Sequence, residues 1–118
     1  MELEELNIYR IAIELGEEVN SIVDKWEYFS KKTVGIQLVR AADSIAANIA
    51  EGYGRFHFKE VNNFSFYARG SLFETKTWLT KANNRGLITD QKFSEFEITI
   101  KDLSVKLNNY IKAIKAKT

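Results

Sequence analysis

Apolar residues recur every three or four positions over four stretches of the chain, the spacing of one helix face. The first stretch runs from Ile8 to about residue 24, and the last runs from Phe93 to Ile114. No stretch alternates polar and apolar residues between turn signals, so no strand is predicted. The positions expected to be buried are Ile8, Ala12, Leu15, Val19, Ile22, Val34, Leu38, Ala41, Ile45, Ile49, Val61, Phe64, Ala68, Leu72, Leu79, Ala82, Phe93, Phe96, Ile100, Leu103, Leu107, Tyr110 and Ile114.

Turn and capping residues separate these stretches. Ser30 or Thr33 is expected to cap the second helix, and the glycines of segment 52–54 to end it in the left-handed conformation. The third helix is expected to begin near Phe58 and to stop at Gly86. Thr89 and Asp90 supply a cap and a first-turn acid for the fourth. The aromatic residues Trp26, Tyr28 and Phe29 are expected to close one end of the bundle.

Four helices of similar length with short connections predict an all-α fold, an antiparallel up-down-up-down four-helix bundle. Residues 1–118 are expected to form one four-helix bundle domain. The chain has no proline, which favours long uninterrupted helices. It has no cysteine, its N-terminal residues lack the pattern of a signal peptide, and no apolar run approaches the ~20 residues of a membrane span. A cytoplasmic protein that makes no membrane contact is therefore expected.

Charge is unevenly distributed although the net charge is only +1. Residues 1–30 hold two bases and eight acids, for a charge of −6, whereas residues 31–118 hold fifteen bases and eight acids, for +7. One interpretation is a basic face for nucleic acid. The other is an acidic helix that complements basic helices within the domain or between subunits, and the sequence favours this second interpretation.

A mixed-charge stripe follows one face of the second predicted helix, with steps of four, four, three and four residues from Arg40 to Arg55. The third predicted helix carries a similar set, in which Gly70 lies beside Ser71 and suggests a close approach of helices. Antiparallel packing would place Arg55 near Glu60 and Arg40 near Glu74, and would bring Ser44 and Asn48 near Tyr67 and Ser71. The predicted structural polar network comprises Arg40, Ser44, Asn48, Glu51, Glu60, Ser71 and Glu74.

Two further sets of residues suggest interactions with other molecules. Apolar residues outside the core stripes of the first, third and fourth helices predict an interface of a homo-oligomer. These residues are Leu6, Tyr9, Ile13, Phe66, Phe73, Ile98 and Val105. Basic residues that could contact RNA or DNA phosphates are Arg55, Lys59, Arg69, Lys112 and Lys115. Tyr53 and Phe56 lie near these bases and could stack on nucleobases or cover the bundle end.

The sequence gives little indication of a catalytic site. His57 is the only histidine, and no second ligand is spaced to join it in a metal site. The segment Gly52-Tyr53-Gly54 is not a phosphate loop, because no Gly-Lys-Ser/Thr follows it and no strand precedes it. We expect no enzyme, no catalytic residue, no metal and no cofactor.

The run from Arg40 to Arg55, with Ser44-Ile-x-x-Asn48-Ile-Ala-Glu-Gly at its centre, resembles a known family. Together with Glu60, Phe64 and Gly70-Ser71-x-x-Glu74, it is similar to the bacterial four-helix bundle proteins of the large-subunit rRNA intervening-sequence family. Some of those proteins are encoded inside intervening sequences of ribosomal RNA genes. The fold also resembles the accessory variability protein of diversity-generating retroelements, a basic pentameric ring that binds a reverse transcriptase and nucleic acid.

The resemblance implies a four-helix bundle that often forms a homopentamer around a central channel, without an assigned enzymatic activity. This chain departs from many relatives because Val39 precedes a single Arg40 where they have an arginine pair. The expected function is a non-catalytic homo-oligomer that acts as an adaptor for a nucleic-acid-associated machine. The alternative is a direct RNA- or DNA-binding module with a basic surface.

Overall fold

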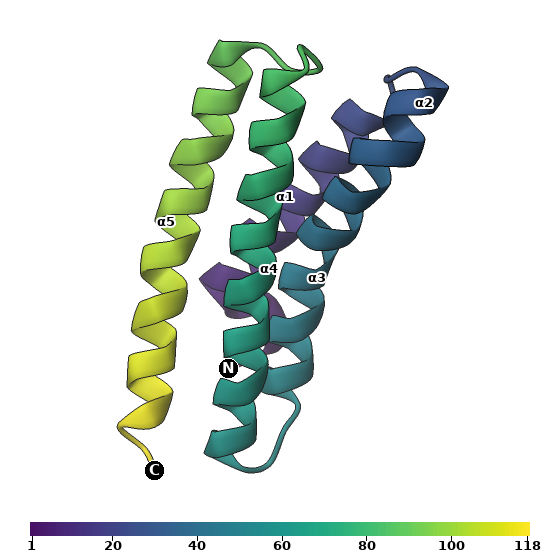
Figure 1. The fold of residues 1–118 in the computed structure, drawn as a ribbon. Coiled ribbons are helices and arrows are strands. Elements are labelled where there is room, and N and C mark those ends of the chain that lie inside the picture. The colour runs from purple at the N-terminus through teal and green to yellow at the C-terminus, as the bar shows by residue number, and fades with distance from the viewer.

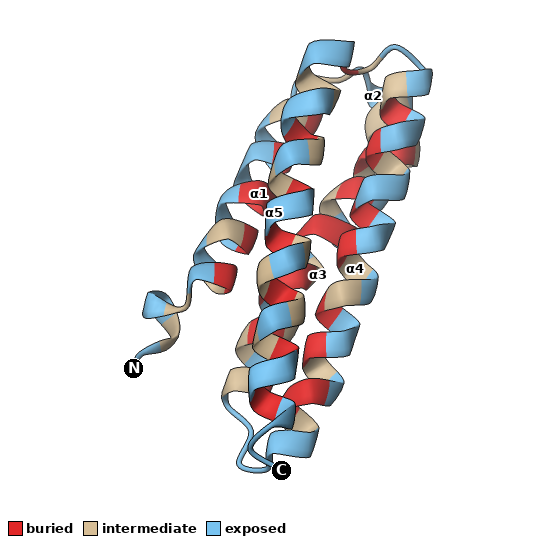
Figure 2. Ribbon diagram, turned by 90° about the vertical axis from the view of Figure 1, so that its left-hand side faces the viewer, coloured by how far each residue is buried: buried red, intermediate tan, exposed pale blue.

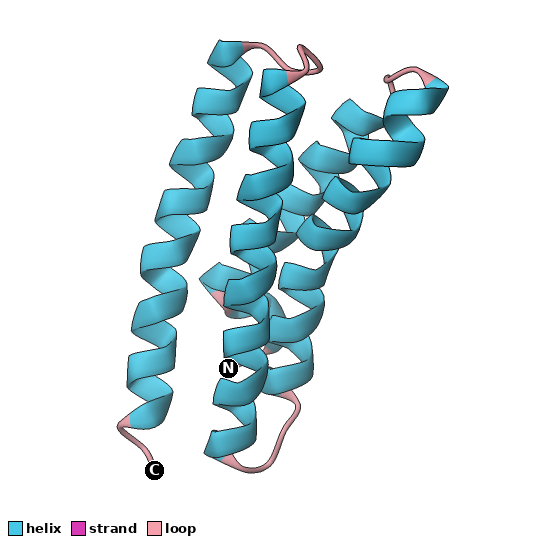
Figure 3. Ribbon diagram, in the orientation of Figure 1, coloured by secondary structure: helices cyan, strands magenta, loops and turns pink.

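Four long helices carry the four apolar stripes of the sequence. In the computed structural model, which describes residues 1–118, they are α1 (Asn7–Val23), α3 (Ile36–Tyr53), α4 (Phe58–Asn84) and α5 (Asp90–Lys115). Three short elements complete the chain: η1 (Leu3–Glu5) precedes α1, and α2 (Tyr28–Ser30) and η2 (Lys31–Gly35) lead into α3. Helices and loops make up the whole structure, and there is no strand (Figure 3). The predicted all-α class is confirmed.

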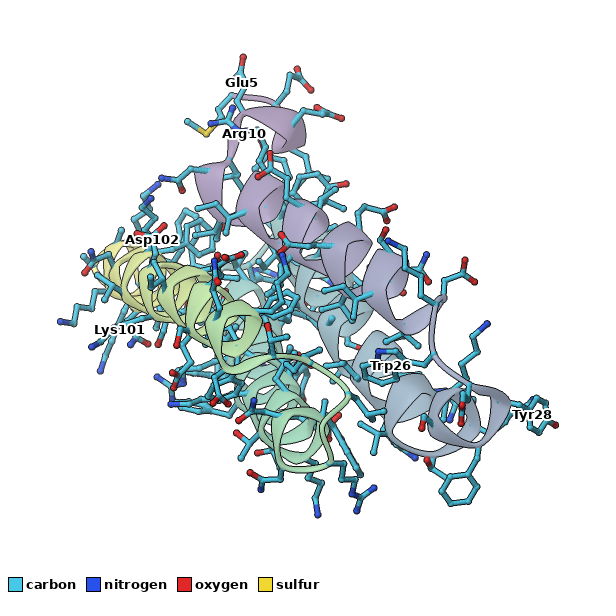
Figure 4. All side chains as sticks on the ribbon, turned by 90° about the horizontal axis from the view of Figure 1, so that it is seen from above. Glu5, Arg10, Trp26, Tyr28, Lys101 and Asp102 are labelled. Carbon is cyan, nitrogen blue, oxygen red and sulfur yellow. The ribbon has the colours of Figure 1, made fainter.

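The four helices pack antiparallel in an elongated bundle of 46 × 23 × 20 Å (Figure 1). α3 packs against α1 and α4, and α5 packs against α4 and, less extensively, against α1. Seen from above, α1 and α3 make one side of the bundle, and α4 and α5 make the opposite side (Figure 4). This arrangement confirms the predicted antiparallel four-helix bundle, and it leaves two helix pairs with outward faces on opposite sides.

Buried residues line the inward faces of all four helices, while the outward faces are exposed (Figure 2). Side chains such as Val19, Ile45 and Leu103 are completely enclosed. Almost every position predicted to be buried is buried, and the exceptions are half-buried: Ile22, Phe64, Phe93 and Tyr110. The helical period therefore identifies the core, because each helix presents one face to its neighbours.

The ends of the last two helices follow the local signals of the sequence. Gly86 adopts a φ of 73°, the left-handed conformation that ends α4. The Thr89 hydroxyl accepts a hydrogen bond of 3.1 Å from the backbone N–H of Lys92, which caps α5. Helix α4 begins at Phe58, as predicted.

The connection between α1 and α3 differs from the prediction. Neither Ser30 nor Thr33 caps a helix, because the chain is helical from Tyr28 onward, and the Thr33 hydroxyl instead donates to the carbonyl of Phe29 at 2.9 Å. Trp26 packs against the core, but Tyr28 and Phe29 are about three-quarters exposed, at 76% and 75%. Tyr28 points away from the bundle (Figure 4). Only Trp26 therefore closes this end, because the helix turns the next two aromatic rings outward.

Glycines allow close packing at positions that the sequence did not indicate. The φ of Gly54 is −79°, so α3 ends without a left-handed residue. A Cβ atom at Gly52 would lie 3.0 Å from both the Cβ of Phe64 and the carbonyl oxygen of Val61, whereas a Cβ at Gly70 would meet nothing within 4 Å. The close approach of α3 and α4 is therefore at Gly52, and the expectation of one at Gly70 is wrong within this chain.

These two glycines give a matched pair of substitutions with opposite expected signs. Gly52→Ala should lower the free energy of unfolding by about 1–3 kcal/mol, since the new methyl group forces α3 and α4 apart. Gly70→Ala should raise it by about 0.5–1 kcal/mol, since alanine favours the helix and the site is open. Urea unfolding followed by circular dichroism, at one protein concentration for both variants, checks this. Equal effects of the two substitutions would contradict the packing described.

Candidate functional site

A groove of about 300 Å³ lies between α1 and α3 on the outer surface, and we name it the α1/α3 groove. Its lining is Tyr9, Ala12, Ile13, Gly16, Glu17, Asp43, Ala46, Ala47 and Ala50. Small residues leave the groove shallow and open. The Asp43 carboxylate lies directly over Gly16, because a Cβ there would be 2.9 Å from Oδ1. The result is an apolar groove that carries two carboxylates, from Glu17 and Asp43.

A second groove, of about 480 Å³, lies between α4 and α5, and we name it the α4/α5 groove. Its lining is Phe73, Lys76, Ser94, Glu97, Ile98, Ile100, Lys101, Ser104 and Val105. Three of its apolar side chains protrude into solvent, with exposed fractions of 60% for Phe73, 71% for Ile98 and 56% for Val105. Lys101 points away from the bundle on α5 (Figure 4). This face therefore combines protruding apolar groups with the ammonium groups of Lys76 and Lys101.

The charged groups of both grooves have no counter-ion within the chain. None of the six ion pairs in the structure includes Glu17, Asp43, Lys76, Lys101 or Glu97. Burial, and to a lesser degree the neighbouring carboxylate of Glu17, raises the pKa of Asp43 above its ordinary value. The two carboxylates of the α1/α3 groove thus repel each other beside apolar surface, and a cation placed between them would relieve that repulsion.

The residues predicted to interact across α3 and α4 meet at one end only. Nη2 of Arg55 lies 2.9 Å from the Glu51 carboxylate, and Nη1 lies 3.6 Å from the Glu60 carboxylate. The Arg55 guanidinium also lies over the Phe64 ring, 4.7 Å from its centre. Arg55 therefore links the end of α3 to the start of α4, as the antiparallel packing implies.

The middle and far end of the predicted polar network do not connect the two helices. Ser44 donates to the carbonyl of Arg40 at 2.7 Å, and Asn48 donates to the carbonyl of Ser44 at 2.8 Å. These short side chains bond their own helix because its carbonyls are the nearest acceptors. The carbonyl of Ser71 likewise accepts from Thr75 on its own helix. Arg40 and Glu74 are exposed and form no ion pair, since water solvates both charges.

Most of the bases predicted to contact nucleic acid gather at one end of the bundle. Arg55 lies in the loop between α3 and α4, Lys59 lies in the first turn of α4, and Lys112 and Lys115 lie in the last turn of α5, close to the C-terminus (Figure 1). Arg69 lies ten residues beyond Lys59 on α4, or about 15 Å along the helix. Its guanidinium donates to Asn108 at 3.2 Å. The structure thus groups four of the five bases and separates Arg69 from them.

The predicted interface residues divide into two groups. Leu6 and Tyr9 are half-buried and pack against the core of their own chain, because η1 and the start of α1 fold onto the bundle. The exposed members are Ile13, Phe66, Phe73, Ile98 and Val105. Of these, Ile13 lines the α1/α3 groove, and Phe73, Ile98 and Val105 line the α4/α5 groove.

No group of three or more histidine, cysteine, aspartate or glutamate side chains is arranged to hold a metal ion. His57 is exposed in the loop before α4, where its ring lies edge-on to Phe56 at 5.0 Å between ring centres. None of the helices is both long enough and apolar enough to cross a bilayer.

No pattern in the sequence indicates the charged residues of the grooves. Glu17 and Asp43 are 26 positions apart, and only the packing of α1 on α3 brings them into one groove. Lys76 and Lys101 are likewise joined by the packing of α4 on α5. The available signal was the contrast between the acidic residues 1–30 and the basic remainder of the chain, which indicated complementary surfaces without identifying their residues.

The fold and the two outer grooves define an antiparallel four-helix bundle protein with exposed apolar faces. Residues 4–109 match the profile of the family described as 23S rRNA-intervening sequence protein, and the chain therefore belongs to that family. The crystal structure of a protein of unknown function from the S23 ribosomal protein family of Bacteroides thetaiotaomicron has the same fold. It aligns with a TM-score of 0.80 at 19% sequence identity, over 89% of this chain and 98% of that one. No curated protein matches the chain.

Proposed function

We propose that this protein is a non-catalytic homo-oligomer, a pentameric ring of helical bundles that serves as an adaptor for a nucleic-acid-associated machine. The observation that carries the proposal is the set of protruding apolar side chains on α4 and α5, which are Phe66, Phe73, Ile98 and Val105. Soluble monomers rarely expose large apolar patches, whereas a subunit of an oligomer buries them, and Phe73, Ile98 and Val105 line one groove.

Two further features support an adaptor without catalysis. Neither groove brings a histidine beside a hydroxyl nucleophile, which acyl transfer by a serine would need. The family is described by its connection to 23S rRNA intervening sequences, which suggests a nucleic-acid-associated process for this member. A ring gives several copies of one partner-binding surface, and such multivalency strengthens weak contacts.

The oligomeric state of the purified chain tests the proposal. Size-exclusion chromatography with light scattering should give a mass near five times the 13.6 kDa of the protomer. A mass that corresponds to another closed assembly would contradict the pentamer but would still support self-association. A mass of 13.6 kDa at every concentration up to the solubility limit would refute self-association.

A second candidate function is direct binding of nucleic acid at the end of the bundle that holds Arg55. The Phe56 ring there is 91% exposed, and neither Lys59, Lys112 nor Lys115 pairs with an acid. An exposed aromatic ring among unpaired bases fits a single-stranded segment, whose bases stack on the ring while its phosphates meet the lysines.

Fluorescence anisotropy with labelled single-stranded RNA, structured RNA and duplex DNA, measured from low to high salt, tests this candidate. We expect Arg55→Ala/Lys59→Ala to weaken binding and to flatten the salt dependence, since two phosphate contacts are lost. Phe56→Ala should weaken the binding free energy for single-stranded RNA by about 1–3 kcal/mol. The control Lys31→Ala/Lys32→Ala removes two charges at the opposite end and should leave the affinity unchanged. Absence of binding by the wild-type protein at low salt would exclude this function.

A further inference from the structure

We propose that the α1/α3 groove of one copy receives the α4/α5 face of the next copy, so that Glu17 and Asp43 meet Lys76 and Lys101. This inference rests on the proposed self-association and adds its geometry. It identifies two different surfaces of the same chain as the two halves of one interface, instead of a surface that pairs with itself.

The shapes of the two faces are complementary. The α1/α3 groove is lined by Ala46, Ala47 and Ala50 from α3 and by Gly16 from α1, so helices or side chains can approach its floor closely. On the opposite face, Ile98 of α5 protrudes with 71% of its surface exposed, in the same groove as the exposed side chains of Phe73 and Val105. A side chain that protrudes from the α4/α5 face can thus enter the apolar α1/α3 groove of another copy, as in ridges-into-grooves packing.

The charges of the two faces are complementary as well. The α1/α3 groove holds two carboxylates and no base, while the α4/α5 groove holds two ammonium groups and the single acid Glu97. None of these charges is paired within the chain. Two copies that faced each other through the same surface would bring like charges together, which costs several kcal/mol. Unlike surfaces in contact bring opposite charges together.

The charge asymmetry of the whole chain agrees with this pairing. Of the eight acids in residues 1–30, only Glu18 and Asp24 pair with a base in the chain, Glu18 with Lys92 at 2.7 Å and Asp24 with Lys31 at 3.8 Å. Most acids of residues 1–30 therefore have no oppositely charged partner within one bundle. The basic α4/α5 face of a second copy supplies one.

The positions of the faces determine the kind of assembly. The two grooves lie on opposite sides of the bundle, because α1 and α3 make one side and α4 and α5 the other (Figure 4). A contact between unlike surfaces leaves one free surface at each end, so further copies can add in one direction. The result is a ring if the rotation between neighbours closes it and an open filament if it does not, and no dyad-related dimer is expected.

Two charge-reversed chains test the pairing. In Glu17→Lys/Asp43→Lys both faces are basic, and in Lys76→Glu/Lys101→Glu both faces are acidic, so neither chain should assemble by itself. An equimolar mixture should assemble, because each basic face then meets an acidic one. Light scattering gives the masses, native mass spectrometry should find equal numbers of the two chains, and circular dichroism confirms that each is folded. The control Lys112→Glu/Lys115→Glu has the same charge change away from the groove and should assemble as the wild type does.

The outcomes separate this inference from the proposed function. A monomeric wild-type protein would refute both. An oligomeric wild-type protein whose charge-reversed variants also assemble alone, or whose mixture fails to assemble, would refute only the pairing of these two faces. If a charge-reversed chain does not fold, Glu17→Gln/Asp43→Asn and Lys76→Gln/Lys101→Gln replace the reversals. Each should then weaken assembly and reduce its dependence on salt, and unchanged assembly would contradict the pairing.

Discussion

The double variant Phe73→Ser/Ile98→Ser is expected to be a folded monomer. Both side chains are mostly exposed in the protomer, so their loss removes little of the bundle's own packing. In an assembly each would be buried, and burial of a large apolar side chain contributes about 1.5–3 kcal/mol. Loss of two such groups from every interface weakens association by several orders of magnitude. Light scattering measures the mass, and thermal unfolding shows whether the protomer retains its stability.

A matched control for this variant is Tyr28→Ser/Phe56→Ser. It also removes two large exposed aromatic or apolar groups, but both lie outside the two grooves, with exposed fractions of 76% and 91%. This control should keep the wild-type mass. If Phe73→Ser/Ile98→Ser also kept that mass, the α4/α5 face would not be part of the interface.

Asn62→Asp is expected to be the most destabilising of the single substitutions considered. Asn62 is only 8% exposed, its Nδ2 donates to the carbonyl oxygen of Ile111 at 3.1 Å, and its Oδ1 has no partner. An aspartate there would place a buried charge opposite a carbonyl oxygen. An uncompensated buried charge costs about 3–5 kcal/mol. Urea unfolding at neutral pH measures this loss directly.

The pH dependence and a second substitution make the explanation specific. Burial favours the protonated carboxyl in the folded state, so the folded variant binds more protons than the unfolded chain, and its stability should rise as the pH falls. Asn62→Leu removes the polar group without adding a charge and should cost about 1 kcal/mol at any pH. Equal losses for the two variants would show that packing, and not charge, determines the effect.

Most of the fold could be predicted from the sequence because the signals are local. A helical period of apolar residues depends on the neighbours three and four positions away, so it identified the four helices and their buried faces. Gly86 and Thr89 act on the backbone within one turn, and their roles were predicted correctly. Ser30 and Thr33 do not cap a helix, because the chain is already helical at both positions. Gly35, in the same segment, lies against the side chains of Val23 and Trp26.

The candidate site was predictable only in part. Exposed apolar residues such as Phe73 and Ile98 follow from the period, since they fall outside the core stripe. The contacts of the polar stripe were harder to predict. Ser44 and Asn48 donate to carbonyl oxygens of their own helix, so they need no hydrogen-bond partner on a neighbouring helix. Arg55 found its predicted partner, Glu60, because a short loop fixes the two helix ends beside each other.

The sequence by itself determined the helices, their inward faces and the imbalance of charge along the chain. The tertiary structure decided which outward faces lie together. The packing of the helices sets the rotation of each helix about its axis and its shift along its neighbours. It places Glu17 and Asp43 in one groove and Lys76 and Lys101 in the other. Such pairs come from different helices, and no period within one helix specifies the side chains of another.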